Sequence, residues 1–332
     1  MKITILGCGF GTALSVLWNK AGHEITAWTK YQEEIDDIRR YGEHKRLLPG
    51  IAVSNRIAFT TDISCVSDAD IVVFAIPSKF VREVAEKVKT HIRPETIILN
   101  VGKGFEEGSN KRLSQVLCET LPDNKIAVMA GPCHAEEVGR GIPTTVVIAS
   151  DDKECAEYIQ EQLQTDTFRI YMNDDVAGCE IAAALKNPLA LCCGIIEGMK
   201  LGDNTIAALM TRGLAEITRL GAAMGAKWET FAGLAGVGDV IVTCTSVHSR
   251  NHRAGILIGE GMSAADAVAR VGTVEGYGCC KIAYGIAKEL DVRTPIIDQL
   301  YKVCYEDKRP VDSLTALMER PQTHEKERYW NP

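Results

Sequence analysis

The sequence lacks four features, and each absence excludes a class of protein. Its 12 cysteines form no Cys-x-x-Cys pattern, so we predict free thiols and no metal site. No apolar run approaches the length of a membrane span, and we expect no integral membrane contact. Basic residues are in deficit, with 37 Lys and Arg against 44 Asp and Glu, which argues against nucleic-acid binding. The first predicted strand begins at Lys2 and leaves no room for a signal peptide, so we expect a cytoplasmic protein.

The 332 residues are 46% hydrophobic and 24% charged, which is typical of a globular protein with two domains. Up to about residue 175, apolar strands alternate with helical segments, and each strand ends in a loop of small residues. This alternation predicts a Rossmann-like, doubly wound α/β domain for dinucleotide binding over residues 1–175. From Val176 onward the pattern is almost wholly helical. We therefore predict a second, all-α substrate and catalytic domain over residues 176–332, ending in a polar tail from Pro321.

A glycine-rich turn comes directly after the first apolar run, residues 2–6. It reads Gly7-Cys8-Gly9-Phe10-Gly11 and leads into a helix. A buried strand, a glycine turn and a helix N-terminus together present backbone N–H groups to a phosphate. The usual dinucleotide pattern is G-x-G-x-x-G, and here the third glycine comes one residue early. We predict a cofactor site at Gly7, Gly9 and Gly11; a tight turn that binds nothing is the alternative.

The second predicted strand, residues 24–28, ends at Thr29-Lys30. An NAD-specific site would place a carboxylate here for the ribose hydroxyls. Lys30 suits a 2′-phosphate instead, so either NADPH or NADH is a candidate cofactor. A solvated surface lysine is an equally open interpretation.

Two later strands also end in polar loops. The strand over residues 95–101 leads to Lys103, which lies between two glycines, and the strand over residues 125–130 leads to Gly131-Pro132-Cys133-His134. Because parallel strands end at one edge of a sheet, we expect these loops to meet the glycine turn in one crevice. A thiol nucleophile with an imidazole base at Cys133 and His134 is disfavoured, since neighbours on a loop seldom face each other.

A lysine and an asparagine interrupt an apolar helical segment at Lys186-Asn187. Burial of an unpartnered ammonium group is expensive. Lys186 therefore either reaches solvent or faces a cleft in which its proton is used. Pro188 follows and cannot donate a hydrogen bond to the Ala184 carbonyl, so we expect the helix to kink here.

A second polar cluster begins with the glycine-rich stretch from Gly233 to Asp239. It continues through several hydroxyl residues to Ser249-Arg250-Asn251. Arginine can bind a phosphate through two hydrogen bonds, and serine and asparagine add further polar contacts. We interpret this cluster as a candidate phosphate site.

Taken together, these motifs resemble the bacterial NAD(P)-dependent glycerol-3-phosphate dehydrogenases over nearly the whole chain, from Gly7 to about Met318. The motifs that carry the resemblance are Lys103-Gly104, Gly131-Pro132, Ala135-Glu136-Glu137, Ala184-Leu185-Lys186-Asn187, Leu201-Gly202-Asp203-Asn204, residues 233–245, Ser249-Arg250-Asn251 and Val274-Glu275-Gly276. The resemblance implies NAD(P)H-dependent reduction of dihydroxyacetone phosphate, a small-molecule phosphate substrate, to sn-glycerol 3-phosphate, the precursor of membrane phospholipids. It leaves a homodimer open.

The resemblance also implies roles for individual residues. Lys186 is similar to the catalytic acid/base of the family, and Lys103 to a second catalytic lysine that stabilises developing charge. The implied substrate contacts are Lys103, Gly131, Cys133, Asp239, Ser249, Arg250 and Asn251. The implied cofactor contacts, added to the glycines and Lys30, are Phe10, Lys103, Ala135, Arg250 and Glu275.

Three positions depart from the family pattern: the glycine turn is one residue short, Cys133 replaces a serine, and Pro188 replaces a branched aliphatic residue. None of these changes removes a catalytic group. Two alternatives stay open, a related β-hydroxyacid or phosphosugar-acid dehydrogenase and a weakened NADPH-binding regulator. The pairing of Arg250 with Asn251 argues against the first, and an intact Lys186 argues against the second.

Overall fold

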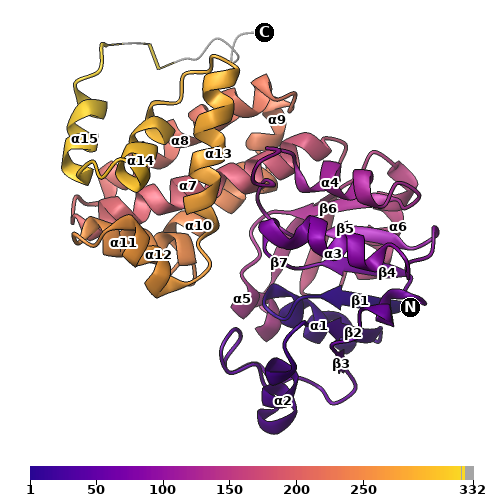
Figure 1. Cartoon of the computed structure of the whole chain (residues 1–332). Helices are drawn as coiled ribbons and strands as arrows, with labels where there is room; N and C mark the ends of the chain where they lie inside the picture. Colours follow the sequence, from indigo (N-terminus) through magenta and orange to yellow (C-terminus); the bar gives the residue numbers. More distant parts are fainter. Residues whose placement is uncertain (323, 326–332) are drawn as a thin grey trace. The chain divides into compact units, whose positions relative to one another are not determined.

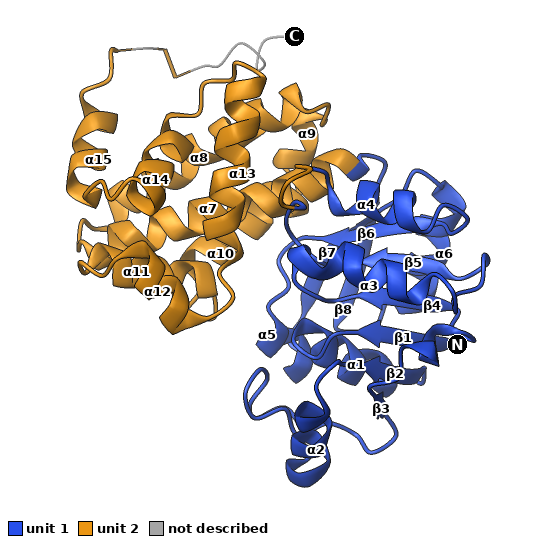
Figure 2. Cartoon of the chain, in the orientation of Figure 1, with its two compact units in different colours: residues 1–106, 111–176 blue, residues 107–110, 177–332 orange. Residues whose placement is uncertain are grey.

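The structure is a computed structural model that describes residues 1–322, 324 and 325. Most of the predicted polar tail lies outside these residues. The chain forms two compact units, which Figure 2 shows in different colours. Unit 1 comprises residues 1–106 and 111–176, and unit 2 comprises residues 107–110 and 177–332.

Unit 1 is built on one eight-stranded sheet (Figure 1). The strands lie in the order β3-β2-β1-β4-β5-β6-β7-β8, and all neighbours pair in parallel except β6 and β7. The strands are β1 (Lys2–Leu6), β2 (Glu24–Trp28), β3 (Ala58–Thr60), β4 (Ile71–Phe74), β5 (Ile97–Asn100), β6 (Ile126–Ala130), β7 (Thr144–Ala149) and β8 (Phe168–Asn173). The doubly wound α/β prediction is confirmed, although the sequence reading missed β3 and the reversed direction of β7 and β8.

Both faces of this sheet are buried, as β4 shows. Ile71 and Val73 belong to a core beneath α1 (Phe10–Lys20), whereas Val72 and Phe74 belong to a second core beneath α3 (Val81–Val88) and α4 (Leu113–Thr120). Successive side chains of a strand point to opposite faces. A strand covered on both faces is therefore apolar throughout, which explains the unbroken hydrophobic run at this position.

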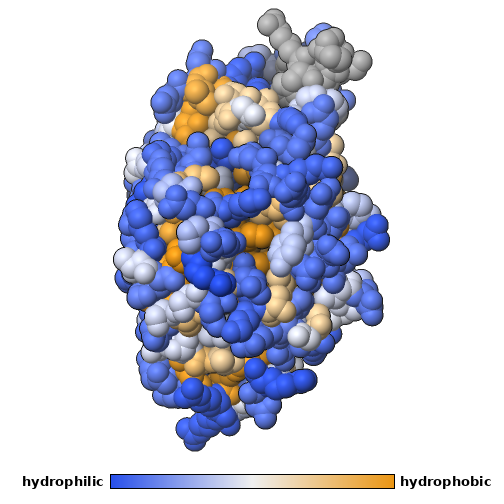
Figure 3. Space-filling model, turned by 90° about the vertical axis from the view of Figure 1, so that its right-hand side faces the viewer, coloured by the Kyte–Doolittle hydropathy of each residue, from blue (hydrophilic) through white to orange (hydrophobic). Residues whose placement is uncertain are grey.

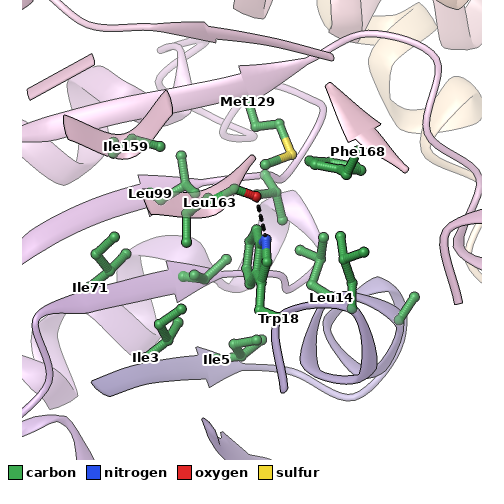
Figure 4. Close-up of a cluster of buried hydrophobic side chains, with 14 of the residues drawn as sticks. Ile3, Ile5, Leu14, Trp18, Ile71, Leu99, Met129, Ile159, Leu163 and Phe168 are labelled. Atoms are coloured by element: carbon green, nitrogen blue, oxygen red, sulfur yellow. Dashed lines mark hydrogen bonds between the residues drawn. The ribbon is translucent and has the colours of Figure 1, made fainter. Parts of the chain in front are cut away.

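Trp18 anchors α1 in the first of these cores (Figure 4). Its side chain is fully buried, and its indole Nε1 donates a hydrogen bond to the carbonyl of Leu163, 3.1 Å away, at the end of α6 (Lys153–Leu163). Buried indoles usually require such a partner. The contact holds α1, whose first residue follows the glycine turn, against the rest of unit 1.

The remaining helices of unit 1 are short and polar on one side. They are α2 (Gln32–Tyr41) and α5 (Ala135–Arg140), with single turns at Ile63–Val66 and Ser78–Phe80.

The face of the protein shown in Figure 3 is mostly hydrophilic, and hydrophobic side chains appear there as separate patches.

Unit 2 is helical throughout its described part, as predicted. Its helices are α7 (Val176–Gly198), α8 (Asp203–Ala223), α9 (Trp228–Phe231), α10 (Asp239–Thr245), α11 (Arg250–Gly259), α12 (Ala264–Val271), α13 (Glu275–Glu289), α14 (Pro295–Tyr305) and α15 (Pro310–Met318). Ser263 is the N-cap of α12, and its hydroxyl oxygen accepts a hydrogen bond from the Asp266 N–H.

Helix α7 is long and apolar enough to cross a membrane, with a mean hydropathy of 1.5. The expectation that no apolar run approaches this length is therefore wrong. The whole apolar window is buried inside the protein, where α7 contacts α8, α10, α11 and α13. Residues 228–245 and Arg250–Gly259, which meet at a bend of 51°, are together also long and apolar enough to cross a membrane.

Pro188 lies inside α7, and the helix continues across it. Because proline has no N–H, the carbonyl of Ala184 loses its usual partner four residues on. The thiol of Cys279, on α13, takes that place and donates to the Ala184 carbonyl, 3.3 Å away. A side chain distant in sequence thus compensates for the proline.

We expect Cys279→Ala to lower the free energy of unfolding by about 1–3 kcal/mol, because it leaves a buried carbonyl without a donor. In a Pro188→Ala background the loss should be smaller, since residue 188 then supplies the missing N–H. Urea unfolding of the four proteins measures this coupling. Cys280→Ala, its neighbour on α13, is the control and should cost the same in both backgrounds. An equal loss for Cys279→Ala in both backgrounds would mean that the thiol only fills space.

Candidate active site

The glycine turn lies at the carboxyl end of β1, where the strand order reverses between β1 and β4. Crevices at such reversal points are where doubly wound sheets bind ligands. Gly7 has φ 107°, and its N–H donates to the Trp28 carbonyl over 2.8 Å. A Cβ at this position would lie 2.5 Å from the carbonyl oxygen of Ala75. The fold itself therefore requires glycine at position 7.

Gly11 also meets a packing requirement. Helix α1 begins at Phe10, and a Cβ on Gly11 would lie 2.8 Å from the side chain of Ile5 on β1. Close helix–strand packing is the usual role of the third glycine in the dinucleotide pattern. Gly11 fills this role although it comes one residue early.

Gly9 differs from both, because a Cβ there would meet no atom within 4 Å. As N-cap of α1, Gly9 offers no side chain to the first N–H groups of the helix. Packing against neighbouring atoms does not require glycine at this position. A bare helix N-terminus beside open space fits the pyrophosphate of a dinucleotide.

Lys30 follows the end of β2, next to the glycine turn. Its ammonium lies 4.6 Å from the ring centre of Phe80 and 5.0 Å from that of Tyr31. Aromatic rings attract a cation without neutralising it. Lys30 thus keeps a positive charge at the strand end where a ribose-binding carboxylate would stand in an NAD-specific site.

A carboxylate does lie near this strand end, on α2, and the sequence analysis missed it. Glu34 is buried, and its two oxygens accept hydrogen bonds from the Thr29 hydroxyl and the Arg46 guanidinium, each over 2.6 Å. Burial opposes ionisation, but His44, Thr29 and Arg46 together lower the pKa of the Glu34 carboxyl. Both oxygens of this carboxylate are thus engaged by side chains of the protein.

The loops after β5 and β6 meet, as expected for neighbouring parallel strands. The ammonium of Lys103 donates to the Gly131 carbonyl over 2.9 Å and lies 3.6 Å from the Cys133 sulfur. The Cys133 thiol donates to the same carbonyl over 3.2 Å. Gly131 has φ 113°, a conformation that favours glycine. Ala135 is the first residue of α5, which follows directly.

Lys186, in unit 2, is buried together with a carboxylate. The side chains of Lys186 and Asp239 are 6% and 1% exposed and form an ion pair. The Lys186 ammonium also donates to the Thr243 hydroxyl oxygen over 2.6 Å. The sequence left open whether the Lys186 side chain reaches solvent. In the structure it does not, because the ammonium is buried and paired with Asp239.

The chain reaches this arrangement through a wide turn before α10. Residues Leu234–Gly238 form a π-helical turn, a feature frequent at functional sites. A Cβ on Gly236 would lie 2.0 Å from the Phe231 carbonyl oxygen, so the turn depends on glycine. Asp239 begins α10, and Thr243 lies one turn later on the same face. This spacing of four residues could have identified Thr243, which the sequence analysis did not select.

Asn187, the residue that follows Lys186 on α7, belongs to a second polar network. The Asn251 amide donates to the Asn187 side-chain oxygen over 2.9 Å, and the Gly276 N–H donates to the Asn251 oxygen over 2.8 Å. A Cβ on Gly276 would lie 2.5 Å from the Asn187 carbonyl oxygen. The network joins α7, α11 and α13, and the side chains of Asn187 and Asn251 fix one another.

The backbones of helices α7 and α11, which both contribute to this network, approach each other closely. A Cβ at any of four glycines would lie 2.0–2.3 Å from a carbonyl oxygen of the other helix; they are Gly194 and Gly198 on α7, and Gly255 and Gly259 on α11. Glycines four residues apart permit this close approach. The repeated spacing was visible in the sequence but was not used.

The remaining predicted residues lie at helix starts. Ser249 is the N-cap of α11, where its hydroxyl oxygen accepts the His252 N–H over 3.2 Å. Arg250 is the first residue of α11 and is exposed, and Glu275 is the first residue of α13. No group of three or more His, Cys, Asp or Glu that could hold a metal occurs in the described part of the chain.

Comparison with known proteins assigns both halves of the chain to one family. The model of the NAD-dependent glycerol-3-phosphate dehydrogenase N-terminus matches residues 2–156, and that of the C-terminus matches residues 175–315. Relatives named glycerol-3-phosphate dehydrogenase, NAD(P)+, occur in Desulfitobacterium hafniense (48% identity, 98% of this chain, 93% of the relative) and Moorella thermoacetica (48%, 98% and 98%). A crystal structure of glycerol-3-phosphate dehydrogenase from Coxiella burnetii is similar, with TM-score 0.92, 34% identity and coverage of 96% and 99%.

Proposed function

Because the chain belongs to the NAD(P)-dependent glycerol-3-phosphate dehydrogenase family, we propose that it reduces dihydroxyacetone phosphate to sn-glycerol 3-phosphate for phospholipid synthesis. The chain is an oxidoreductase that uses NADH or NADPH and acts on glycerol 3-phosphate. The observation that carries the proposed mechanism is the buried pair of Lys186 and Asp239, with Thr243 beside it.

Reduction of a carbonyl requires a hydride at carbon and a proton at oxygen. When bound, the nicotinamide supplies the hydride. We assign the role of proton donor to Lys186. A proton on its Nζ is transferred to the C2 oxygen as negative charge develops on that oxygen. Asp239 keeps the amine charged and, with Thr243, holds it in one orientation. In the reverse direction the same nitrogen accepts the proton from the alcohol.

We assign a second role to Lys103 and its loop. Its ammonium already interacts with the Gly131 carbonyl and the Cys133 sulfur, so its position is fixed before a ligand arrives. A fixed positive charge stabilises an oxygen on which negative charge develops. Lys103, Gly131 and Cys133 are proposed to contact the substrate, and Lys103 and Ala135 the cofactor.

We assign the substrate phosphate to the start of α11. Arg250 supplies a guanidinium, and Ser249 and Asn251 supply polar groups beside the positive end of the helix. Asn251 is buried and already oriented by Asn187. Arg250 and Glu275 are also proposed cofactor contacts, together with Gly7, Gly9, Phe10, Gly11 and Lys30.

Replacement of Arg250 by alanine tests this phosphate site. We expect kcat/KM for dihydroxyacetone phosphate to fall by the equivalent of about 2–5 kcal/mol, as for the loss of one partner of a charge pair. With phosphate-free dihydroxyacetone the same substitution should have little effect. Arg253→Ala, three residues later and also exposed, is the matched control and should behave as wild type. An unchanged kcat/KM in Arg250→Ala would overturn the assignment.

A further inference from the structure

Unit 2 contains a cavity that none of the roles above uses. Its volume is about 670 Å³, within the range of roughly 300–1,000 Å³ that is usual for small-molecule sites. Helices α7, α8, α14 and α15 form its walls. Figure 2 shows these helices in unit 2, and α14 packs against both α8 and α15.

One face of α8 lines the cavity along most of the length of the helix. Its lining residues on this helix run from Thr205 through Ala208, Leu209 and Arg212 to Ala223. They follow the three- and four-residue spacing of a single helix face. At 1.5 Å per residue this face extends for about 27 Å. A chain-shaped ligand matches such a cavity better than a compact one.

The walls are largely hydrophobic, with Ile195 and Met199 from α7 and Leu300 from α14. The buried acidic side chain among them is Glu216. Its two carboxylate oxygens accept the N–H groups of Ile296 and Ile297 over 2.9 and 2.8 Å at the start of α14. Burial raises the pKa of Glu216 to about 7. Each oxygen of Glu216 thus already has a hydrogen-bond donor from α14.

Four arginines border this apolar cavity: Arg212, Arg219, Arg293 and Arg320. They come from α8, from the segment before α14 and from the residues that follow α15. The acidic side chains that line the cavity are Glu216, Asp291 and Glu325, so the four arginines exceed the three acidic residues by one. A chain with 37 basic and 44 acidic residues thus gathers a local excess of positive charge at one hydrophobic cavity. This combination is complementary to a long apolar chain that ends in an anion.

We propose that this cavity binds a single-chain amphiphile with an anionic headgroup, such as a long-chain fatty acid. The hydrocarbon chain lies along α8, and the headgroup lies among the arginines. The proposal does not depend on the dehydrogenase mechanism. A second copy of the chain is the competing occupant.

Titration of the full chain with cis-parinarate, a fluorescent fatty acid, tests the proposal below the concentration at which the probe aggregates. We expect saturable binding to one site per chain, with displacement by oleate. Ala208→Trp fills the cavity and should weaken binding about tenfold or more, a loss of about 1.4 kcal/mol. Ala207→Trp is the matched control and should bind as wild type, because Ala207 is exposed like Ala208 but does not line the cavity. The double variant Arg293→Gln/Arg320→Gln should weaken oleate but leave oleyl alcohol unchanged.

Three results would overturn the proposal. They are an absence of saturable binding, equal binding by the Ala208→Trp and Ala207→Trp variants, and binding of oleyl alcohol as tight as that of oleate. Sedimentation of the same proteins identifies the competing occupant. If Ala208→Trp dissociates a dimer and no variant binds the probe, a second copy of the chain fills the cavity. Circular dichroism of each variant establishes whether it is folded. If Ala208→Trp does not fold, the arginine variant still tests the proposal.

Discussion

Lys186→Met is expected to lower kcat for dihydroxyacetone phosphate by about 10²–10⁴-fold, the usual contribution of a positioned general acid. Methionine keeps much of the side-chain volume but carries no proton to donate. Binding of NADPH, measured by fluorescence titration, should be retained, because the glycine turn that we assign to the cofactor belongs to unit 1. Lys200→Met, an exposed lysine just after α7, is the control and should keep wild-type kcat.

A purely structural lysine would give a different result. Lys186→Met would then lower the melting temperature while the folded fraction kept its kcat. That outcome would contradict the assignment of Lys186 as the proton donor. It would leave the family membership of the chain intact, because the latter rests on separate observations.

Asp239→Leu is expected to be the most destabilising change at the site. It leaves the buried Lys186 ammonium without its carboxylate, and loss of one partner of a buried pair typically costs about 3–5 kcal/mol. The double variant Lys186→Met/Asp239→Leu removes both charges and should recover most of this free energy of unfolding, because apolar residues replace both partners.

Urea unfolding of the two single variants and the double variant measures this effect as a double-mutant cycle. The double variant should nevertheless be as inactive as Lys186→Met alone. Stability losses that simply add would show that the two side chains do not depend on each other. A stable Asp239→Leu protein would show that burial of Lys186 does not depend on this carboxylate.

The sequence predicts the sheet of unit 1 well where burial dominates. Residues such as Val72 and Phe74 lie in strands covered on both faces, and their unbroken apolar runs are distinct. The three-residue strand Ala58–Thr60 was missed because it is too short for a pattern and is only partly buried. The reversed direction of β7 and β8 was missed because strand direction depends on how connections pack and leaves no local trace.

The candidate site could be predicted only in part for a similar reason. Lys186 is conspicuous because a charge in an apolar segment needs an explanation. Its partner Thr243, and the thiol of Cys279 that serves the Ala184 carbonyl, are more than 50 residues away from the groups they contact. Their roles arise from tertiary packing. The four-residue spacing of Gly194 and Gly198, repeated in Gly255 and Gly259, was an available signal for the crossing of α7 and α11.

The central claim is that this chain is a dehydrogenase whose substrate carries a phosphate. The most direct test is NAD(P)H oxidation by the purified full chain with dihydroxyacetone phosphate, dihydroxyacetone and a panel of keto acids. Our account predicts a kcat/KM for dihydroxyacetone phosphate about 10²-fold or more above that for every other compound, because a site built to pair with a polar group rejects analogues that lack it. A keto acid that matches or exceeds dihydroxyacetone phosphate would contradict the account.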